Sequence, residues 1–207
     1  MKIAVFGVCL WLPVSVCQAD IIDFRSAGVG ASLDGKTSGT FSVPGFSSLT
    51  ISIVNVTADG DGEVANATAS SFGVNAAGGI TTSGDNADRF DSVLNEAITF
   101  SFNKAVLVSY LDFSNFTNGE VFQFGDTVIT SGSLRAGQAS EYDFVTPLLI
   151  GANSPFTLQA TSGSIGLQRI ELDLAAVPEP SAVAMCCLGL MIVATRLRPR
   201  LKRKLAV

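Results

Sequence analysis

The chain has 207 residues, of which 47% are hydrophobic, and it carries a formal net charge of −5. It contains no histidine, which excludes Ser-His-Asp and Cys-His catalytic arrangements and every metal site that uses a histidine ligand. Residues 20–176 alone hold 17 acidic and 6 basic residues, a net charge of −11, and a surface of that sign repels nucleic acid.

The chain begins with the pattern of a secretory signal peptide. Lys2 supplies a positive start, residues 3–16 are mainly apolar, and Cys17 and Ala19 place small residues at the two positions that signal peptidase reads. We therefore expect cleavage after Ala19, so that Asp20 becomes the first residue of an exported protein.

The cysteines fit this interpretation. A lipoprotein signal that ends at Cys17 is the alternative, but Val16 is large where such a signal has a small residue. The other cysteines are Cys9 near the start of the chain and the neighbouring pair Cys186 and Cys187 near its end. Residues 20–176 therefore contain no cysteine, which excludes a disulfide framework there.

Residues 20–176 are dominated by an alternation of apolar and polar side chains, which predicts β-strands. Residues 106–113 are apolar at both parities until Asp112, which predicts a strand covered on both faces. The parity of the apolar residues changes near Gln168, which predicts a β-bulge. Residues 54–90 are rich in Gly, Ala and Asp and predict long loops. The expected strands span residues 21–24, 40–43, 49–54, 98–103, 106–113, 120–124, 126–130, 142–145, 156–160 and 165–174.

This number of short strands, separated by Gly- and Asp-rich turns and without any helical periodicity, indicates an all-β fold. We expect residues 20–176 to form one antiparallel β-sandwich of jelly-roll type. A segment of this length is sufficient to bury a hydrophobic core as a single domain.

The chain ends with three adjacent features of different chemistry. A proline-rich peptide is followed by residues 182–195, which include no charged side chain, and then by a basic tail over residues 196–207. The peptide consists of Val177, Pro178, Glu179, Pro180 and Ser181, and the cations of the tail are Arg196, Arg198, Arg200, Lys202, Arg203 and Lys204.

The apolar run predicts one transmembrane helix over residues 182–195. It is shorter than the span of about 18–20 residues that a bilayer requires, but the stems of Arg196 and Arg198 can extend it to the lipid headgroups. Pro178 and Pro180 prevent the helix from continuing upstream. Because Lys and Arg are retained on the cytoplasmic side, the basic tail is expected in the cytoplasm and the rest of the protein outside the membrane.

Together these residues resemble the PEP-CTERM sorting signal of exported proteins from bacteria with an outer membrane. The resemblance implies that a membrane-embedded cysteine protease, the exosortase, recognises the signal and processes the protein for the cell surface. It is confined to residues 177–207 and implies nothing about residues 20–176. The alternative is an ordinary C-terminal tail anchor in which the prolines form only a linker.

Four acidic residues are the candidate calcium ligands: Asp85, Asp88, Asp91 and Glu96. Several carboxylate oxygens within a short segment suit a hard cation, although the spacing is not that of an EF-hand. The favoured alternative is an acidic turn in which the carboxylates accept hydrogen bonds from nearby backbone. Calcium is the one cofactor that the sequence brings into consideration.

The aromatic residues give little indication of a sugar-binding platform. The one tryptophan, Trp11, lies in the predicted signal peptide. Phe113, Phe116 and Phe122 flank a predicted turn and form either part of the core or a small exposed patch. Their alternation within strands favours the core.

The sequence therefore predicts an exported envelope or extracellular-matrix protein with a structural or adhesive role and no enzymatic activity. Its expected partners are signal peptidase, the exosortase and membrane lipid. The alternative is a module that binds exopolysaccharide through its loops and a bound cation. A hydrolase with two catalytic carboxylates is a third possibility, but no pair of acidic residues is singled out by the sequence.

Overall fold

The computed structural model describes residues 19–59, 63–76, 87–138 and 140–175. These residues form strands arranged in two antiparallel sheets, with almost no helix, which confirms the prediction of an all-β fold. The helical turns are α1 (Gly30–Leu33), η1 (Ser92–Leu94) and η2 (Ser131–Ser133). The strands are β1 (Asp20–Asp23), β2 (Gly39–Ser42), β3 (Thr50–Thr57), β4 (Val64–Ala67), β5 (Phe72–Asn75), β6 (Phe90–Asp91), β7 (Ala97–Phe102), β8 (Val106–Ser114), β9 (Val121–Phe124), β10 (Thr127–Thr130), β11 (Glu141–Ile150), β12 (Phe156–Ser162) and β13 (Ser164–Leu174).

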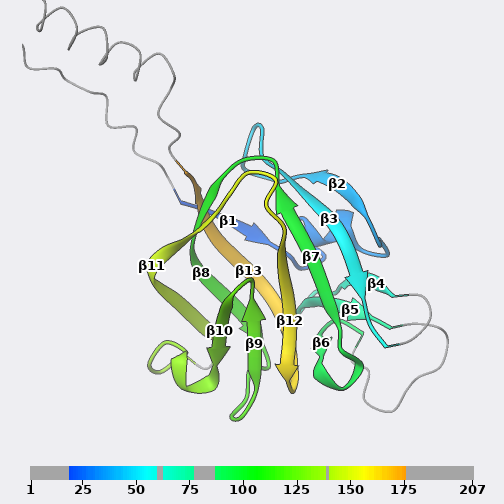
Figure 1. Cartoon of the computed structure of the whole chain (residues 1–207), viewed down its shortest axis with the longest axis vertical. Coiled ribbons are helices and arrows are strands. Elements are labelled where there is room, and N and C mark those ends of the chain that lie inside the picture. Colours follow the sequence, from blue (N-terminus) through cyan, green and yellow to red (C-terminus); the bar gives the residue numbers. More distant parts are fainter. Residues whose placement is uncertain (1–18, 60–62, 77–86, 139, 176–207) are drawn as a thin grey trace, which may run out of the picture. The chain divides into compact units, whose positions relative to one another are not determined.

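Each sheet combines consecutive strands, such as β4 and β5 or β9 and β10, with strands that are distant in the sequence. The first sheet has the order β11-β8-β13-β5-β4, and β1 and β6 also pair with β13. The second has the order β10-β9-β12-β7-β3-β2. Figure 1 shows the second sheet in front of the first. Strand β13 pairs with four other strands and is therefore the centre of the first sheet.

One hydrophobic core contains side chains from both sheets. Phe100 of β7 lies 5.9 Å from Phe24, which follows β1, and 6.1 Å from Phe72 of β5, measured between ring centroids. On its own sheet it lies 6.0 Å from Phe156 of β12. Phe24, Phe72 and Phe100 are fully buried, so aromatic packing joins the inner faces of the two sheets.

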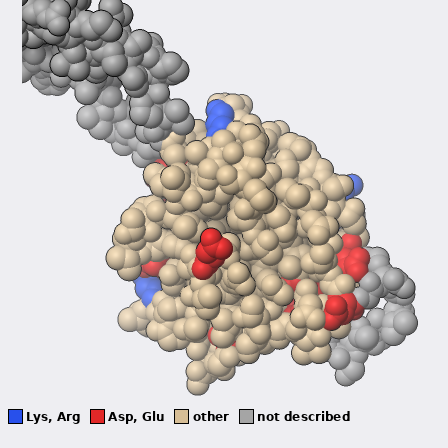
Figure 2. Space-filling view, in the orientation of Figure 1, with Lys and Arg blue, Asp and Glu red and all other residues tan. Residues whose placement is uncertain are grey.

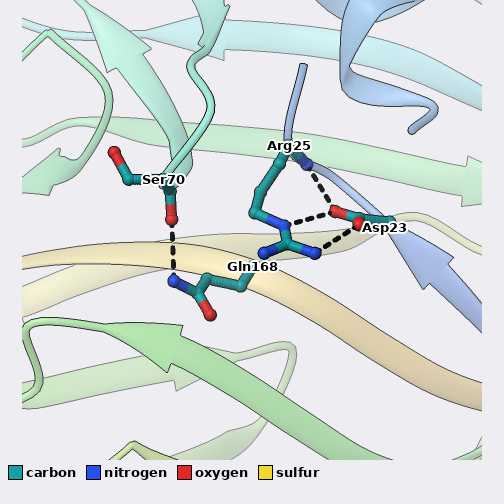
Figure 3. A network of polar contacts seen from close by, with 4 residues as sticks. All are labelled: Asp23, Arg25, Ser70 and Gln168. Atoms are coloured by element: carbon teal, nitrogen blue, oxygen red, sulfur yellow. Dashed lines mark hydrogen bonds and ion pairs between the residues drawn. The ribbon is translucent and has the colours of Figure 1, made fainter. Parts of the chain in front are cut away.

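The predicted bulge in β13 is confirmed. The pairing of β13 with β8 shifts register between Leu167 and Arg169, which leaves Gln168 as the extra residue. The Gln168 carbonyl accepts a hydrogen bond from the Phe24 amide at 2.8 Å, and the Gln168 side chain donates to the Ser70 carbonyl at 2.7 Å (Figure 3). The bulge therefore connects β13 to the end of β1 and to the turn between β4 and β5.

The prediction that residues 106–113 form a strand covered on both faces is wrong. Val106 and Val108 are buried, and the buried residues then change parity to Leu111 and Phe113. The register of β8 against β13 shifts at this point, between Val108 and Tyr110. A second irregularity, rather than cover on both faces, explains the continuous apolar run.

The prediction of loops over residues 54–90 is also wrong in part, because this segment contains β4 and β5. Gly73 of β5 lies so close to residue 89 that a β-carbon added to it would approach the Arg89 carbonyl carbon to 2.2 Å. The neighbouring Val74 amide donates to the Arg89 carbonyl at 2.9 Å. A residue without a β-carbon is therefore required at position 73 for these two backbones to meet. Glycine has a low strand propensity, so this requirement weakens the strand pattern in the sequence.

Several predicted features lie outside the described residues: most of the signal peptide, the motif Val177 to Ser181, the apolar run over residues 182–195 and the basic tail. Within the described ranges, no helix has the length and apolar character needed to cross a membrane. Strand β1 begins at Asp20 and β13 ends at Leu174.

Candidate functional site

Three of the four predicted calcium ligands, Asp88, Asp91 and Glu96, lie among the described residues and take part in local hydrogen bonds. Asp85 lies outside the described residues. Asp88 accepts hydrogen bonds from Thr68 and Ser71, each hydroxyl 2.6 Å from its Oδ2 atom, and a longer one from Ser70 at 3.4 Å. Burial raises the pKa of Asp88, but these hydrogen bonds and the charge of Arg89 outweigh it, so the pKa lies below its ordinary value. The carboxylate thus organises the turn between β4 and β5.

The remaining two candidates, Asp91 and Glu96, are both buried and lie at opposite ends of the short helical turn η1. The Glu96 carboxylate accepts a hydrogen bond from the Asp91 amide at 2.7 Å, and the Glu96 amide donates to the Asp91 carbonyl at 3.2 Å. Glu96 therefore closes a local turn. Across the part of the chain that the structure describes, no group of three or more His, Cys, Asp or Glu residues is arranged to hold a metal ion.

The aromatic patch considered from the sequence is part of the core. Phe113, Phe116 and Phe122 are all buried, and the ring of Phe113 lies 5.2 Å from that of Phe116 and 5.0 Å from that of Phe122. The expectation of core residues is therefore confirmed, and these rings do not offer a platform for a sugar.

The candidate site that the sequence did not reveal lies on the outer face of the first sheet. Strand pairing aligns charged residues in a row across four strands, in the order Glu141 (β11), Asp112 (β8), Arg169 (β13) and Asp23 (β1). Their neighbours two positions along each strand form a second row on the same face, Asp143, Tyr110, Glu171 and Ile21. We call these two rows the charged face.

Arginines pair with carboxylates at both ends of the charged face. Arg135 contacts Glu141 at 3.0 Å and Asp143 at 3.3 Å. At the opposite end Arg25 folds back onto Asp23, with its Nη2 atom 2.6 Å and its Nε atom 2.9 Å from the carboxylate oxygens (Figure 3). The hydrogen bonds from Arg25 lower the pKa of Asp23. These two arginines are therefore already engaged by acidic partners.

In the middle of the charged face, the pKa values of Asp112 and Tyr110 are raised. Asp112 and Glu141 are direct cross-strand neighbours, an arrangement that is unfavourable for two like charges. Burial, together with the charge of Glu141, raises the pKa of Asp112 against the opposing effect of Arg169. Burial and the nearby charges of Asp112 and Glu141 raise the pKa of Tyr110 to about 12, so this phenol is protonated at neutral pH.

Arg169 differs from the other two arginines. It lies between Asp112 and Asp23 in the first row and affects the pKa of both, yet no carboxylate among the described residues lies within ion-pair distance of its guanidinium. It lines a cleft of about 420 Å³ together with Tyr110, Arg135, Glu141, Asp143 and Glu171. We call this cleft the charged cleft. The cleft therefore combines a guanidinium that forms no ion pair with the described residues and several hydrogen-bond acceptors.

A second hollow, of about 580 Å³, lies where the second sheet adjoins residues 148–150 of β11. Thr99, Gln123 and Thr157 line it from β7, β9 and β12, and the turn from Gly151 to Ser154 forms one rim. Thr99 and Thr157 already bond to each other at 3.0 Å, and Gln123 donates to the Gly125 carbonyl at 2.9 Å. Figure 2 shows only scattered charges on the face it displays. This hollow offers fewer unsatisfied groups than the charged cleft.

Comparison with known proteins adds no family. No protein-family model matches the chain, and no curated protein or solved structure is significantly similar to it. A function for this chain is therefore inferred from its own residues.

Proposed function

We propose that the protein is exported and sorted to the cell surface by an exosortase, and that it has a structural or adhesive role in the envelope or extracellular matrix. In this account residues 1–19 direct export, residues 177–207 act as the sorting signal, and the domain between them is a non-enzymatic, jelly-roll-like β-sandwich. Signal peptidase, the exosortase and membrane lipid are the partners of the two end segments.

The observation that carries the proposal is the position of the folded strands relative to the two terminal patterns. Strand β1 begins at Asp20, directly after the expected cleavage site, and β13 ends at Leu174, three residues before Val177. Asp20 pairs with Leu172, so the two ends of the described domain lie together. Loss of residues 1–19 and 177–207 would therefore remove no strand of either sheet.

The packing between the sheets supports the proposed sandwich, and the acidic charge supports the proposed surface role. Rings from both sheets share one core around Phe100, as in two sheets packed face to face. The excess of acidic residues over residues 20–176 keeps such a domain soluble and disfavours contact with nucleic acid.

Deletion of residues 177–207 is expected to release the protein from the membrane and the cell surface into the periplasm or the medium. The apolar run and the basic tail are the only segments of the mature chain predicted to engage lipid. Cell fractionation and immunoblotting of the native host would measure the change. Retention of the truncated protein in the membrane fraction would contradict the assignment of the anchor.

A double variant, Pro178→Ala with Pro180→Ala, is the matched control because it leaves the apolar run and the cations intact. We expect this variant to remain associated with the inner membrane but to be lost from the surface. If it reaches the surface like the unaltered protein, residues 177–207 act as an ordinary tail anchor.

A carbohydrate-binding module is the second candidate, and the charged cleft is the observation that favours it. Sugar sites use carboxylates and arginines as hydrogen-bond partners for ring hydroxyls, and the cleft presents both. The loop-bound cation of this candidate has less support, because Asp88 and Glu96 are used in local turns.

A further inference from the structure

We infer that the charged cleft binds an acidic sugar through Arg169, with the sugar carboxylate against the guanidinium and the ring hydroxyls against the neighbouring carboxylates. This inference deepens the carbohydrate-binding candidate and rests on the proposed export of the domain to a surface where such polymers occur. It concerns the outer face of β1, β8, β11 and β13.

Arg169 differs from Arg25 and Arg135 because it forms no ion pair with the described residues. A guanidinium presents five donors in a fork that fits a carboxylate with two parallel hydrogen bonds. Arg25 and Arg135 bind carboxylates of the protein at 2.6–3.3 Å. Arg169 lies on the same face, half-buried, and has no such partner among the described residues. No carboxylate of the described residues therefore occupies the donors of Arg169, which lines the cleft.

The balance of charge in the cleft favours a ligand with few negative charges. Two arginines, Arg135 and Arg169, face three carboxylates, Glu141, Asp143 and Glu171. Negative charge thus slightly exceeds positive charge, which opposes a doubly charged anion such as a phosphate monoester. A sugar ring with one carboxylate placed against Arg169 and neutral groups elsewhere reduces this repulsion.

The lining of the cleft is rich in hydrogen-bond acceptors. The carboxylates of Glu141 and Asp143 already bind Arg135, and that of Glu171 accepts from Ser109. Each ionised carboxylate has further acceptor positions and no donor, so the lining suits a ligand that donates hydrogen bonds. Ile21 is the one aliphatic side chain of the lining, which leaves little apolar surface for the side chains of a peptide. A sugar ring with hydroxyls and one carboxylate meets all of these conditions.

The test measures binding of the full-length protein, purified in a mild detergent, to polygalacturonate and alginate by calorimetry at an ionic strength of about 0.15 M, which screens the repulsion between the acidic domain and a polyanion. We expect measurable binding to at least one of these polymers, and we expect methyl esterification of the polygalacturonate to abolish binding to that polymer, because it removes the charge and keeps the hydroxyls. Polyglutamate, which has carboxylates without hydroxyls, is expected to bind more weakly. Absence of binding to both sugar polymers, or equal binding to polyglutamate, overturns the inference.

Arg169→Gln is expected to weaken binding by about tenfold to a hundredfold, as for the loss of a charge-assisted hydrogen bond. Lys36→Gln makes the same change of charge at an exposed site outside the cleft and is expected to have no effect. If Arg169→Gln does not fold, Arg169→Lys preserves the charge but not the fork and is expected to weaken binding by a smaller factor. Unchanged affinity in the folded Arg169 variant overturns the inference.

The outcome is separable from that of the proposed function. If the protein reaches the surface but substitution of Arg169 does not change binding, the proposed sugar site is refuted and the sorting proposal stands. Recovery of the protein from the cytosol refutes the sorting proposal, whether or not the cleft binds sugar.

Discussion

Replacement of Phe100 by alanine is expected to lower the free energy of unfolding by about 3–5 kcal/mol, the usual cost of removing a buried phenylalanine ring. Phe100 belongs to the second sheet but packs against Phe24 and Phe72 of the first and against Phe156 of its own. The variant would leave a cavity where the sheets meet. Urea denaturation of residues 20–175, followed by circular dichroism, measures the effect.

Phe41→Ala is the matched control for this prediction. Phe41 lies on the edge strand β2 and is only partly buried against the core. Its truncation is expected to cost about 1 kcal/mol, a typical value for point substitutions. An equal cost for the two variants would mean that Phe100 does not lie at a junction between the sheets.

Gly73→Ala is expected to destabilise the domain by about 1–3 kcal/mol or more, the range for a group forced into a packed interior. The new β-carbon would lie 2.2–2.3 Å from the carbonyl carbon, the α-carbon and the carbonyl oxygen of Arg89. Because these are backbone atoms, no rotation of a side chain relieves the clash. Separation of β5 from residue 89 would also break the hydrogen bond from the Val74 amide.

Gly132→Ala provides the control, because a β-carbon there would meet only the Thr130 hydroxyl oxygen, at 3.9 Å. Its stability is expected to lie within about 0.5 kcal/mol of the unaltered domain. Thermal unfolding of both variants under identical conditions gives the comparison. A Gly73→Ala protein as stable as Gly132→Ala would show that β5 and residue 89 are not in contact.

The strands with regular alternation could be predicted from the sequence because one of their faces is buried. Ile98, Phe100 and Phe102 are fully buried, and Thr99 and Ser101 between them are not. The same reasoning located the bulge at Gln168, since a change of parity requires an extra residue. It failed for β8, where an irregularity between Val108 and Tyr110 placed apolar residues at both parities.

Strands β4 and β5 were missed for a different reason. Their sequences, Val64–Ala67 and Phe72–Asn75, are rich in Ala, Asn and Gly, which have low strand propensity. Both are stabilised by contacts with distant segments, such as the hydrogen bond from Asn66 to the Ala87 carbonyl at 2.6 Å. Tertiary packing of this kind leaves no periodic pattern.

The charged face was missed because its residues come from four strands that are spread between residues 20 and 174 of the chain. Asp23, Asp112, Glu141 and Arg169 each occupy an ordinary polar position of an alternating strand. Only the order β11-β8-β13-β1 places them in one row, and strand order cannot be derived from alternation alone. Among the acidic residues that lie close together in the sequence, the Asp88 carboxylate accepts a hydrogen bond from Ser71, and the Asp91 backbone amide donates to Glu96.

Mass spectrometry of the mature protein from its native host, combined with fractionation of the cell, tests the central claim of export most directly. We predict a protein in the envelope or at the surface whose first residue is Asp20. A protein recovered from the cytosol with residues 1–19 still attached would contradict the account.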